Sequence, residues 1–270
     1  MAKEQGDAVS SAAMEILSRL GNIPSQDLAL SKSLVPGDYF CTLPIMFQLG
    51  ALQRESASYL GLTSSSVFLN EFQKAFWEHL ELGHRRFSAS APTSSGKSFI
   101  VKIWIEEFLH RKNGNTIVYI APTRALVQEI AQELGERMLT AKLGVGVFQW
   151  IDQESMEAER AVFVLTQERC QQMLESDWQR EIDALIIDEA HKVEEATRGV
   201  LLEYVIARIA SRYPNAYQLF LAPTIANPEI FVDGGAEQSI ASKRSVVVQN
   251  LIWVDAVNRK PREWQVCVVE

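Results

Sequence analysis

Short apolar runs alternate with longer amphipathic stretches along most of the chain after residue 70. The runs have the length and composition of buried strands, and the stretches between them carry apolar residues at helical spacing. The predicted strands are Phe87–Ala91, Thr116–Ala121, Val145–Gln149, Ala161–Leu165, Ile182–Asp188 and Tyr217–Ala222. The predicted helices are Lys97–Lys112, Arg124–Met138, Gln167–Leu174 and Glu194–Arg212. This alternation is typical of βαβ units, so we predict an α/β fold with a mostly parallel sheet flanked by helices.

The first part of the chain has a different pattern, which predicts helices. Ala8–Leu20 carries apolar residues at helical spacing and is followed by the stop signal of Gly21, Asn22 and Pro24. A second helix is predicted over Ile45–Leu60, directly after Pro44. The Ser-rich turn after it separates this part from the α/β pattern.

We therefore expect three parts in the chain. Residues 1–68 form a helical N-terminal extension, 69–240 form the main α/β domain, and 241–270 form a linker with edge strands. In the last part, Val246–Val254 and Trp264–Val269 are strand-like.

Composition narrows the classes of function. The formal net charge is −8 and the sequence pI is about 5.2, which argues against a protein that coats nucleic acid through a general basic field. The three cysteines, Cys41, Cys170 and Cys267, are odd in number and match no metal spacing, so we expect a reducing, intracellular (cytoplasmic) compartment. No apolar run approaches the roughly 20 residues of a membrane span, and we expect no membrane partner.

A candidate phosphate-binding loop follows the first predicted strand and opens a helix. Its residues are Ala91, Pro92, Thr93, Ser94, Ser95, Gly96, Lys97 and Ser98. Backbone N–H groups of Thr93 to Gly96 and the helix N-terminus suit phosphate oxygens, Lys97 can reach the β and γ phosphates, and Ser98 can ligate Mg²⁺. Ala91 stands where the usual pattern has its first glycine. The competing interpretation is an ordinary helix cap.

The sequence Asp188-Glu189-Ala190-His191 stands at the end of the apolar strand Ile182–Asp188. Two adjacent carboxylates at a strand tip can divide the chemistry of hydrolysis. Asp188 would hold Mg²⁺ and Glu189 would activate the attacking water. A solvated acidic turn is the competing interpretation, but it does not account for the apolar residues that lead into the acids.

With these two motifs, the chain resembles the N-terminal, RecA-like ATP-binding lobe of superfamily 2 helicases of the DExH kind. The resemblance extends from Gln73 to Asn227. Gln73 lies 18 residues before Ala91 and resembles the family's upstream glutamine, which implies a contact with the adenine of ATP.

The resemblance also implies contacts with a nucleic-acid strand. Pro122, Thr123 and Arg124 resemble the P-T-R-x-L motif that holds the sugar-phosphate backbone. Independently, Thr123 can cap the next helix, and that helix N-terminus and Arg124 both favour a phosphate. Thr166 and Gln167 resemble the family's T-P-x-x contact with the same strand, with Gln167 in place of the proline.

A third motif links hydrolysis to strand binding in this family. Ala222, Pro223 and Thr224 occupy the place of S-A-T and depart from it at the first two residues. Thr224 would pair with His191 to couple the two activities. Asn227 follows, as in the branch with T-x-x-N.

Aromatic residues at helical spacing have a simpler interpretation. We expect Phe72, Phe76, Trp77, Trp104 and Phe108 in the core, rather than stacked on nucleic-acid bases.

The leading hypothesis is the lobe of an ATP-dependent helicase or translocase that uses Mg²⁺ and pulls one strand of DNA or RNA. No motif of a second lobe follows Asn227, so we expect a second lobe in a longer chain or in trans, with a nuclease or adaptor as a possible further partner. The isolated lobe should hydrolyse ATP weakly. A catalytically incomplete regulatory or scaffold module is the main alternative, and another P-loop enzyme, such as a kinase or transporter ATPase, is a third.

Overall fold

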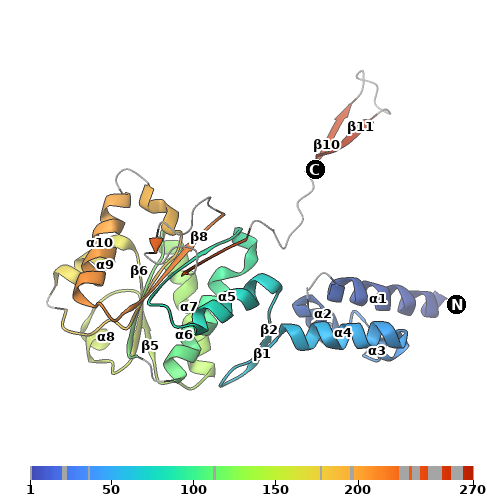
Figure 1. Cartoon of the computed structure of the whole chain (residues 1–270), viewed down its shortest axis with the longest axis horizontal. Coiled ribbons are helices and arrows are strands. Elements are labelled where there is room, and N and C mark those ends of the chain that lie inside the picture. The colour runs from blue at the N-terminus through green and yellow to red at the C-terminus, as the bar shows by residue number, and fades with distance from the viewer. Residues whose placement is uncertain are drawn as a thin grey trace.

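The computed structural model describes residues 2–19, 23–35, 37–111, 114–176, 178–194, 198–224, 231–232, 238–242, 251–256 and 264–269. In these residues a parallel sheet is covered by helices on both faces, and a group of helices from the N-terminal part lies to one side (Figure 1). The predicted α/β fold class is confirmed.

The main sheet is parallel at every pairing among the described residues. Its strand order is β5-β6-β4-β7-β8-β3-β9. The strands are β3 (Arg86–Ser90), β4 (Thr116–Ile120), β5 (Gly146–Phe148), β6 (Ala161–Leu165), β7 (Ala184–Ile187), β8 (Tyr217–Ala222) and β9 (Ser239–Ala241). The six predicted strands all form, with shifted ends in four of them. Strand β9 was not predicted, because three residues at a sheet edge leave little periodicity to detect.

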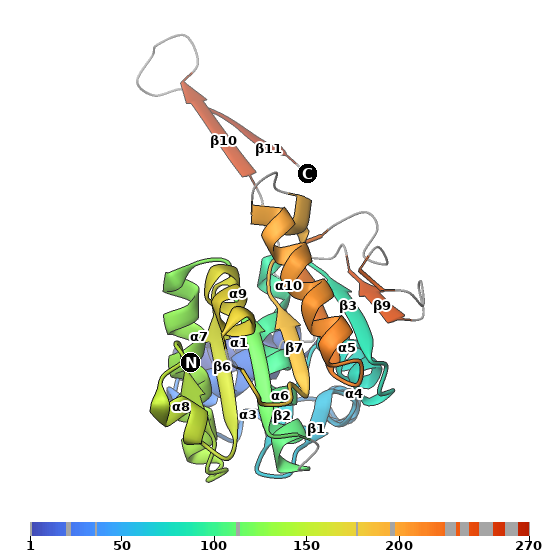
Figure 2. The same cartoon turned by 90° about the vertical axis from the view of Figure 1, so that its left-hand side faces the viewer.

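Two layers of helices bury the two faces of the sheet (Figure 2). One layer is α5 (Glu71–Glu81), α6 (Lys97–His110) and α7 (Arg124–Thr140), and the other is α9 (Gln167–Glu175) and α10 (Arg198–Arg212). Along β4, Ile117 and Tyr119 pack into the first layer, whereas Val118 and Ile120 pack into the second. Because both faces are buried, the strands are apolar throughout, which is why the sequence shows runs rather than alternation.

The expected core aromatics lie in the first layer. Phe76, Trp77, Trp104 and Phe108 are buried, and Phe72 is partly buried against them. The ring centroids of Trp104 and Phe108 are 4.8 Å apart. The four buried rings are not available to stack on a base.

The N-terminal extension contains four helices among the described residues. They are α1 (Ala2–Arg19), α2 (Ile23–Ser31), α3 (Tyr39–Thr42) and α4 (Ile45–Ser58). The first and last were predicted. Helix α2 was not, because Pro24 was interpreted as a stop signal, whereas it lies in the first turn of α2, where a missing N–H is tolerated.

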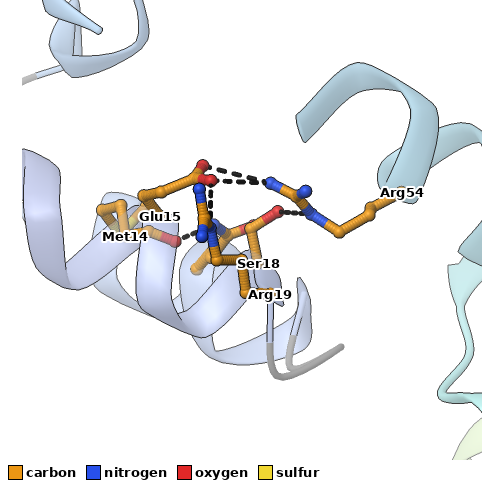
Figure 3. A network of polar contacts seen from close by, with 6 residues as sticks. Met14, Glu15, Ser18, Arg19 and Arg54 are labelled. Carbon is orange, nitrogen blue, oxygen red and sulfur yellow. Dashed lines mark hydrogen bonds and ion pairs between the residues drawn. The ribbon is translucent and has the colours of Figure 1, made fainter. Parts of the chain in front are cut away.

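A polar network joins the two long helices of this extension (Figure 3). The Arg54 guanidinium on α4 donates to both carboxylate oxygens of Glu15 on α1, at 3.0 and 3.1 Å, and to Ser18 Oγ at 2.8 Å. Arg19 Nε also donates to Glu15, at 2.8 Å. The Glu15 side chain is only 10% exposed, so these donors compensate a largely buried carboxylate.

A hairpin connects the extension to the main domain. It consists of β1 (Tyr59–Gly61) and β2 (Ser66–Phe68), so the predicted helix Ile45–Leu60 ends two residues early. In the hairpin turn, Thr63 Oγ1 donates to Glu107 Oε2 at 2.8 Å and Ser64 Oγ donates to Glu106. Both glutamates are buried on α6, and these bonds dock the hairpin on that helix.

At the other end, β10 (Leu251–Ala256) and β11 (Trp264–Val269) form a separate antiparallel pair. The predicted strand Trp264–Val269 is confirmed, and Val246–Val254 lies partly outside the described residues. The three-part division at 1–68, 69–240 and 241–270 stays a prediction. Among the residues that the structure describes, no helix combines the length and the apolar character needed to cross a membrane.

Candidate active site

The predicted site segments meet at one edge of the sheet, beyond the carboxyl ends of the strands. Because the strands are parallel, their carboxyl ends share this edge, where α/β sheets bind ligands. Backbone hydrogen bonds join neighbouring strand tips: Ala91 N to Ala222 O (3.3 Å), Ala121 N to Leu165 O (2.9 Å) and Asp188 N to Ile120 O (2.9 Å). The phosphate loop and the other motifs are thereby brought together.

The phosphate loop has the backbone conformation that an anion cradle requires. Thr93–Ser95 form one 3₁₀ turn, and Gly96 follows in the left-handed region at φ 80° before α6 begins. A side chain at Gly96 would be strained and would collide with the Gln73 amide. Thr93 and Ser94 are exposed, whereas Ser95 is buried and its hydroxyl has no partner among the described residues. That hydroxyl is free to bond a ligand oxygen.

Lys97 lies within this loop. Its ammonium donates to the carbonyl oxygens of Ala91 at 2.5 Å and Pro92 at 3.1 Å. Burial lowers the pKa of Lys97, while the nearby carboxylates of Asp188 and Glu189 oppose that shift. The lysine therefore faces both acids, and a phosphate oxygen would compete with the loop carbonyls for its protons.

Gln73 joins α5 to the phosphate loop. Its backbone N–H donates to Asn70 Oδ1 at 2.9 Å, and its Oε1 accepts from Asn70 N at 3.0 Å, which forms a capping box at the start of α5. Its Nε2 donates to Ser95 O at 3.3 Å. The predicted adenine contact by Gln73 stays a prediction, because both ends of this amide are bonded within the chain.

Asp188 has a partner that the sequence did not indicate. The hydroxyl of Tyr119, fully buried on β4, donates to Asp188 Oδ2 at 3.0 Å. Burial raises the pKa of Asp188, and the bond from Tyr119 opposes the rise. Burial also raises the pKa of Tyr119 well above its usual value. The Ser98 hydroxyl opposes this rise in the pKa of Tyr119, so both candidate magnesium ligands, Ser98 and Asp188, lie near the same phenol.

Tyr119 was missed because it lies in an apolar run that predicts core. The available signal was its hydroxyl, since a buried tyrosine normally finds a hydrogen-bond partner.

Glu189 has a strained backbone. Its φ is 56°, in the left-handed region, which costs a residue with a side chain about 1–2 kcal/mol. Strain of this kind is concentrated at functional sites. His191, in the 3₁₀ turn Ala190–Glu194, places Nδ1 3.3 Å from Glu189 Oε2, outside hydrogen-bonding geometry.

The two threonines of the candidate strand-binding motifs both cap helices. Thr123 Oγ1 accepts from Leu126 N at 3.3 Å at the start of α7, and Thr166 Oγ1 accepts from Arg169 N at 3.4 Å at the start of α9. The predicted cap by Thr123 is confirmed. Arg124 is exposed and makes no hydrogen bond or ion pair with the described residues, so its guanidinium is available to a ligand.

One small cavity lies between the acidic pair Asp188-Glu189 and two of the candidate strand-contact residues. Pro122, Gln167, Asp188 and Glu189 line it together. The acidic pair and two candidate strand-contact residues thus share one space, although they come from three different strand ends.

The third motif, Ala222-Pro223-Thr224, is bonded to the end of β3, directly before the phosphate loop. Ser90 Oγ, at the end of β3, donates to Pro223 O at 2.9 Å. Thr224 and His191 are both described, and no hydrogen bond joins them, so their coupling stays a prediction. Asn227 lies outside the described residues.

The residues present suit a magnesium ion better than a transition metal. Among the described residues there is no group of three His, Cys, Asp or Glu side chains that could hold a metal ion. Magnesium needs no such cage, since it is commonly bound through one or two carboxylates, waters and substrate phosphates. Asp188 and Ser98, which both lie near Tyr119 beside the phosphate loop, fit that mode.

Comparison with known proteins gives a family and a fold. The family model described as DEAD/DEAH box helicase matches residues 70–229. ATP-dependent DNA helicase Hel308 of Pyrococcus horikoshii is 28% identical over 190 residues, which cover 66% of this chain and 26% of that protein. Putative helicase 7 of Sulfolobus islandicus filamentous virus is 29% identical over 154 residues, 54% of this chain and 25% of the relative.

Solved structures agree on the fold. The DUF1998 helicase MrfA superimposes with a TM-score of 0.51 at 19% identity, over 63% of this chain and 29% of that one. MrfA bound to DNA gives a TM-score of 0.51 at 17% identity, over 68% and 28%. This chain spans about a quarter of the length of the curated relatives it matches.

Proposed function

This chain belongs to the DEAD/DEAH box helicase family, and we propose that it is the ATP-binding lobe of a motor that moves along a single strand of nucleic acid. The observation that carries the proposal is the arrangement around Asp188. This carboxylate accepts a hydrogen bond from Tyr119, which lies near Ser98, and it is close enough to Lys97 to oppose the shift in the lysine pKa. Such an arrangement suits Mg·ATP.

Each residue around the phosphate loop and the pair Asp188-Glu189 has a distinct task in this proposal. Lys97 neutralises the β and γ phosphates, while Ser98 and Asp188 would hold Mg²⁺, which when bound offsets charge on the phosphate oxygens. Glu189 accepts the proton of the attacking water. His191 lies beside Glu189 and would sense whether the γ phosphate is present. The backbone groups from Thr93 to Gly96 orient the phosphates.

The strand-binding side supports the nucleic-acid part of the proposal. Pro122 to Arg124 and Thr166 to Gln167 each stand at the start of a helix, where N–H groups and the helix dipole favour a phosphate. The small cavity shared with Asp188 and Glu189 provides a short route from hydrolysis to strand binding. Backbone contacts of this kind fix the strand without selecting a sequence.

Unwinding is proposed to need a second lobe that closes on this one around ATP, since domain closure completes the catalytic group in such motors. Arginine fingers on a partner contribute about 10³ to 10⁵ in rate to related phosphoryl transfers. This lobe by itself should therefore bind Mg·ATP and turn it over slowly.

The alternative is a scaffold that keeps the fold without turnover. The strained Glu189 favours the enzyme, because a scaffold gains nothing from that strain. The test is the ATPase rate of this chain with and without single-stranded DNA and RNA, with Glu189→Gln as the control for contaminating activity. We expect a slow ATPase rate that increases when a single strand is added and that is lost in Glu189→Gln. Equal rates in the two proteins would leave the scaffold as the better account.

A further inference from the structure

Trp150 is exposed at the edge of the sheet that carries the site. It lies two residues after β5, and 56% of it is exposed. The pattern of the sequence gave no reason to single it out. An exposed indole presents a large apolar face that a ligand ring can pack against.

The indole is held in place rather than free to rotate. Its Nε1 donates to Asp152 Oδ2 at 2.8 Å. Asp152 is itself fixed, because its Oδ1 accepts from Ser155 N at 2.8 Å and its N–H donates to Ser155 Oγ at 2.9 Å, a capping box that opens α8 (Gln153–Glu157). Since the indole's only polar atom is already bonded, the exposed part of Trp150 is its apolar ring.

Trp150 adjoins the candidate strand contacts. Strand β5 is parallel to β6, with Phe148 opposite Phe163. Arg169, in the first turn of α9, donates to Gln149 O at 2.7 Å, so the backbone next to Trp150 is tied to the helix that Thr166 caps. The backbone that carries Trp150 is thus tied to a helix start that suits a backbone phosphate.

We propose that Trp150 stacks on a base of the single strand whose backbone is held at Thr166 and Gln167. The inference rests on the proposed function and extends it from backbone contact to base contact. Every base has a π face, so this contact tolerates any sequence. The negative charge of Asp152 disfavours a phosphate at this point, whereas a neutral base meets no such repulsion.

The experiment measures equilibrium binding of this chain to two labelled strands of equal length, one with bases and one abasic. The wild type should prefer the strand with bases. Trp150→Ala should bind that strand about tenfold more weakly, within the range reported for loss of one stacked base. Binding to the abasic strand should not change. Trp150→Phe should recover most of the preference, because a smaller ring still stacks.

Tyr204→Ala is the matched control, because it removes an aromatic residue of similar exposure (44%) from the middle of α10. It should bind both strands as the wild type does. A Trp150→Ala protein that keeps the preference, or that loses affinity for both strands alike, overturns the stacking role. If the wild type binds neither strand, the proposed function fails together with the stacking role. Failure of the stacking role alone leaves strand binding intact, so the two outcomes can be told apart.

Discussion

The Tyr119 hydroxyl donates a 3.0 Å hydrogen bond to Oδ2 of Asp188 from near the carboxyl end of the neighbouring strand. Strands β4 and β7 lie side by side, and Asp188 directly follows β7. The ring of Tyr119 is wholly buried among the helices of the first layer, so its neighbours hold the phenol in place. It therefore fixes the orientation of the carboxylate.

Tyr119→Phe should weaken nucleotide binding in the presence of Mg²⁺ by about tenfold, as expected for the loss of one hydrogen bond to a charged group. In EDTA its affinity should equal that of the wild type, because the phosphate loop is untouched. Fluorescent ATP titrations in the two buffers measure both values.

Two controls separate this effect from damage to the fold. Tyr213→Phe removes the hydroxyl of another buried tyrosine and should leave both affinities unchanged. In an Asp188→Ala background, Tyr119→Phe should have no further effect, because the oxygen that accepts its hydrogen bond is gone. Equal losses in Mg²⁺ and in EDTA would assign Tyr119 a structural role only.

Lys97→Ala and Glu189→Gln should separate binding from hydrolysis. The first removes a charge from the phosphate loop and should abolish tight Mg·ATP binding, with little effect on the melting temperature. The second should keep binding and lower turnover by about 10²- to 10⁴-fold, the usual contribution of a general base. Nucleotide titration and single-turnover hydrolysis distinguish them, and unimpaired hydrolysis in Glu189→Gln would exclude it as the base.

Arg124→Ala should weaken single-strand binding to a similar extent for every sequence. The side chain is exposed and contributes charge, so the slope of log affinity against log salt should fall by about one. Titrations at several salt concentrations measure this. A loss confined to one sequence would mean that Arg124 reads bases.

Arg54→Ala should loosen the N-terminal extension. It removes the guanidinium that bonds both carboxylate oxygens of the largely buried Glu15, which should lower the stability of the extension by about 1–3 kcal/mol. Arg19→Ala is the control, because Arg19 is 56% exposed and such pairs contribute only about 0.2–1 kcal/mol. Hydrogen exchange in α1 and α4 should accelerate clearly in the first variant and little in the second. The reverse order would refute the role given to the network.

Cys170 should resist alkylation in the folded protein. Burial raises its pKa from 9.0 to about 12, whereas Cys41 is exposed. Between pH 9.0 and about 12 the Cys170 thiol stays protonated in the folded protein but ionises in the unfolded chain. Its contribution to stability is therefore present below pH 9.0 and is lost as the pH rises toward about 12. Peptide mass spectrometry after iodoacetamide treatment should find Cys41 modified first. Rapid labelling of Cys170 in the native protein would contradict its burial.

The sequence was sufficient for the order along the chain of strands β3 to β8 and of the four long helices between them, whereas α8 and β9 were not predicted. Strands such as Ala161–Leu165 and Tyr217–Ala222 were predicted with the bounds that the structure shows, since strands buried on both faces leave uninterrupted apolar runs. The phosphate loop and the pair Asp188-Glu189 were also recognisable, because each is a run of neighbouring residues after such a strand. Local pattern alone carries that information.

What only the tertiary structure decided are the contacts between residues far apart in the chain. The bond from Tyr119 to Asp188, the cavity that joins Gln167 to Glu189 and the tie from Arg169 to Gln149 all depend on which strands are neighbours. Strand order cannot be read from apolar runs, because each run fits any position in a buried sheet equally well. The exposure of Trp150 has the same origin, since an aromatic residue at the end of a strand is core or surface according to what packs beside it.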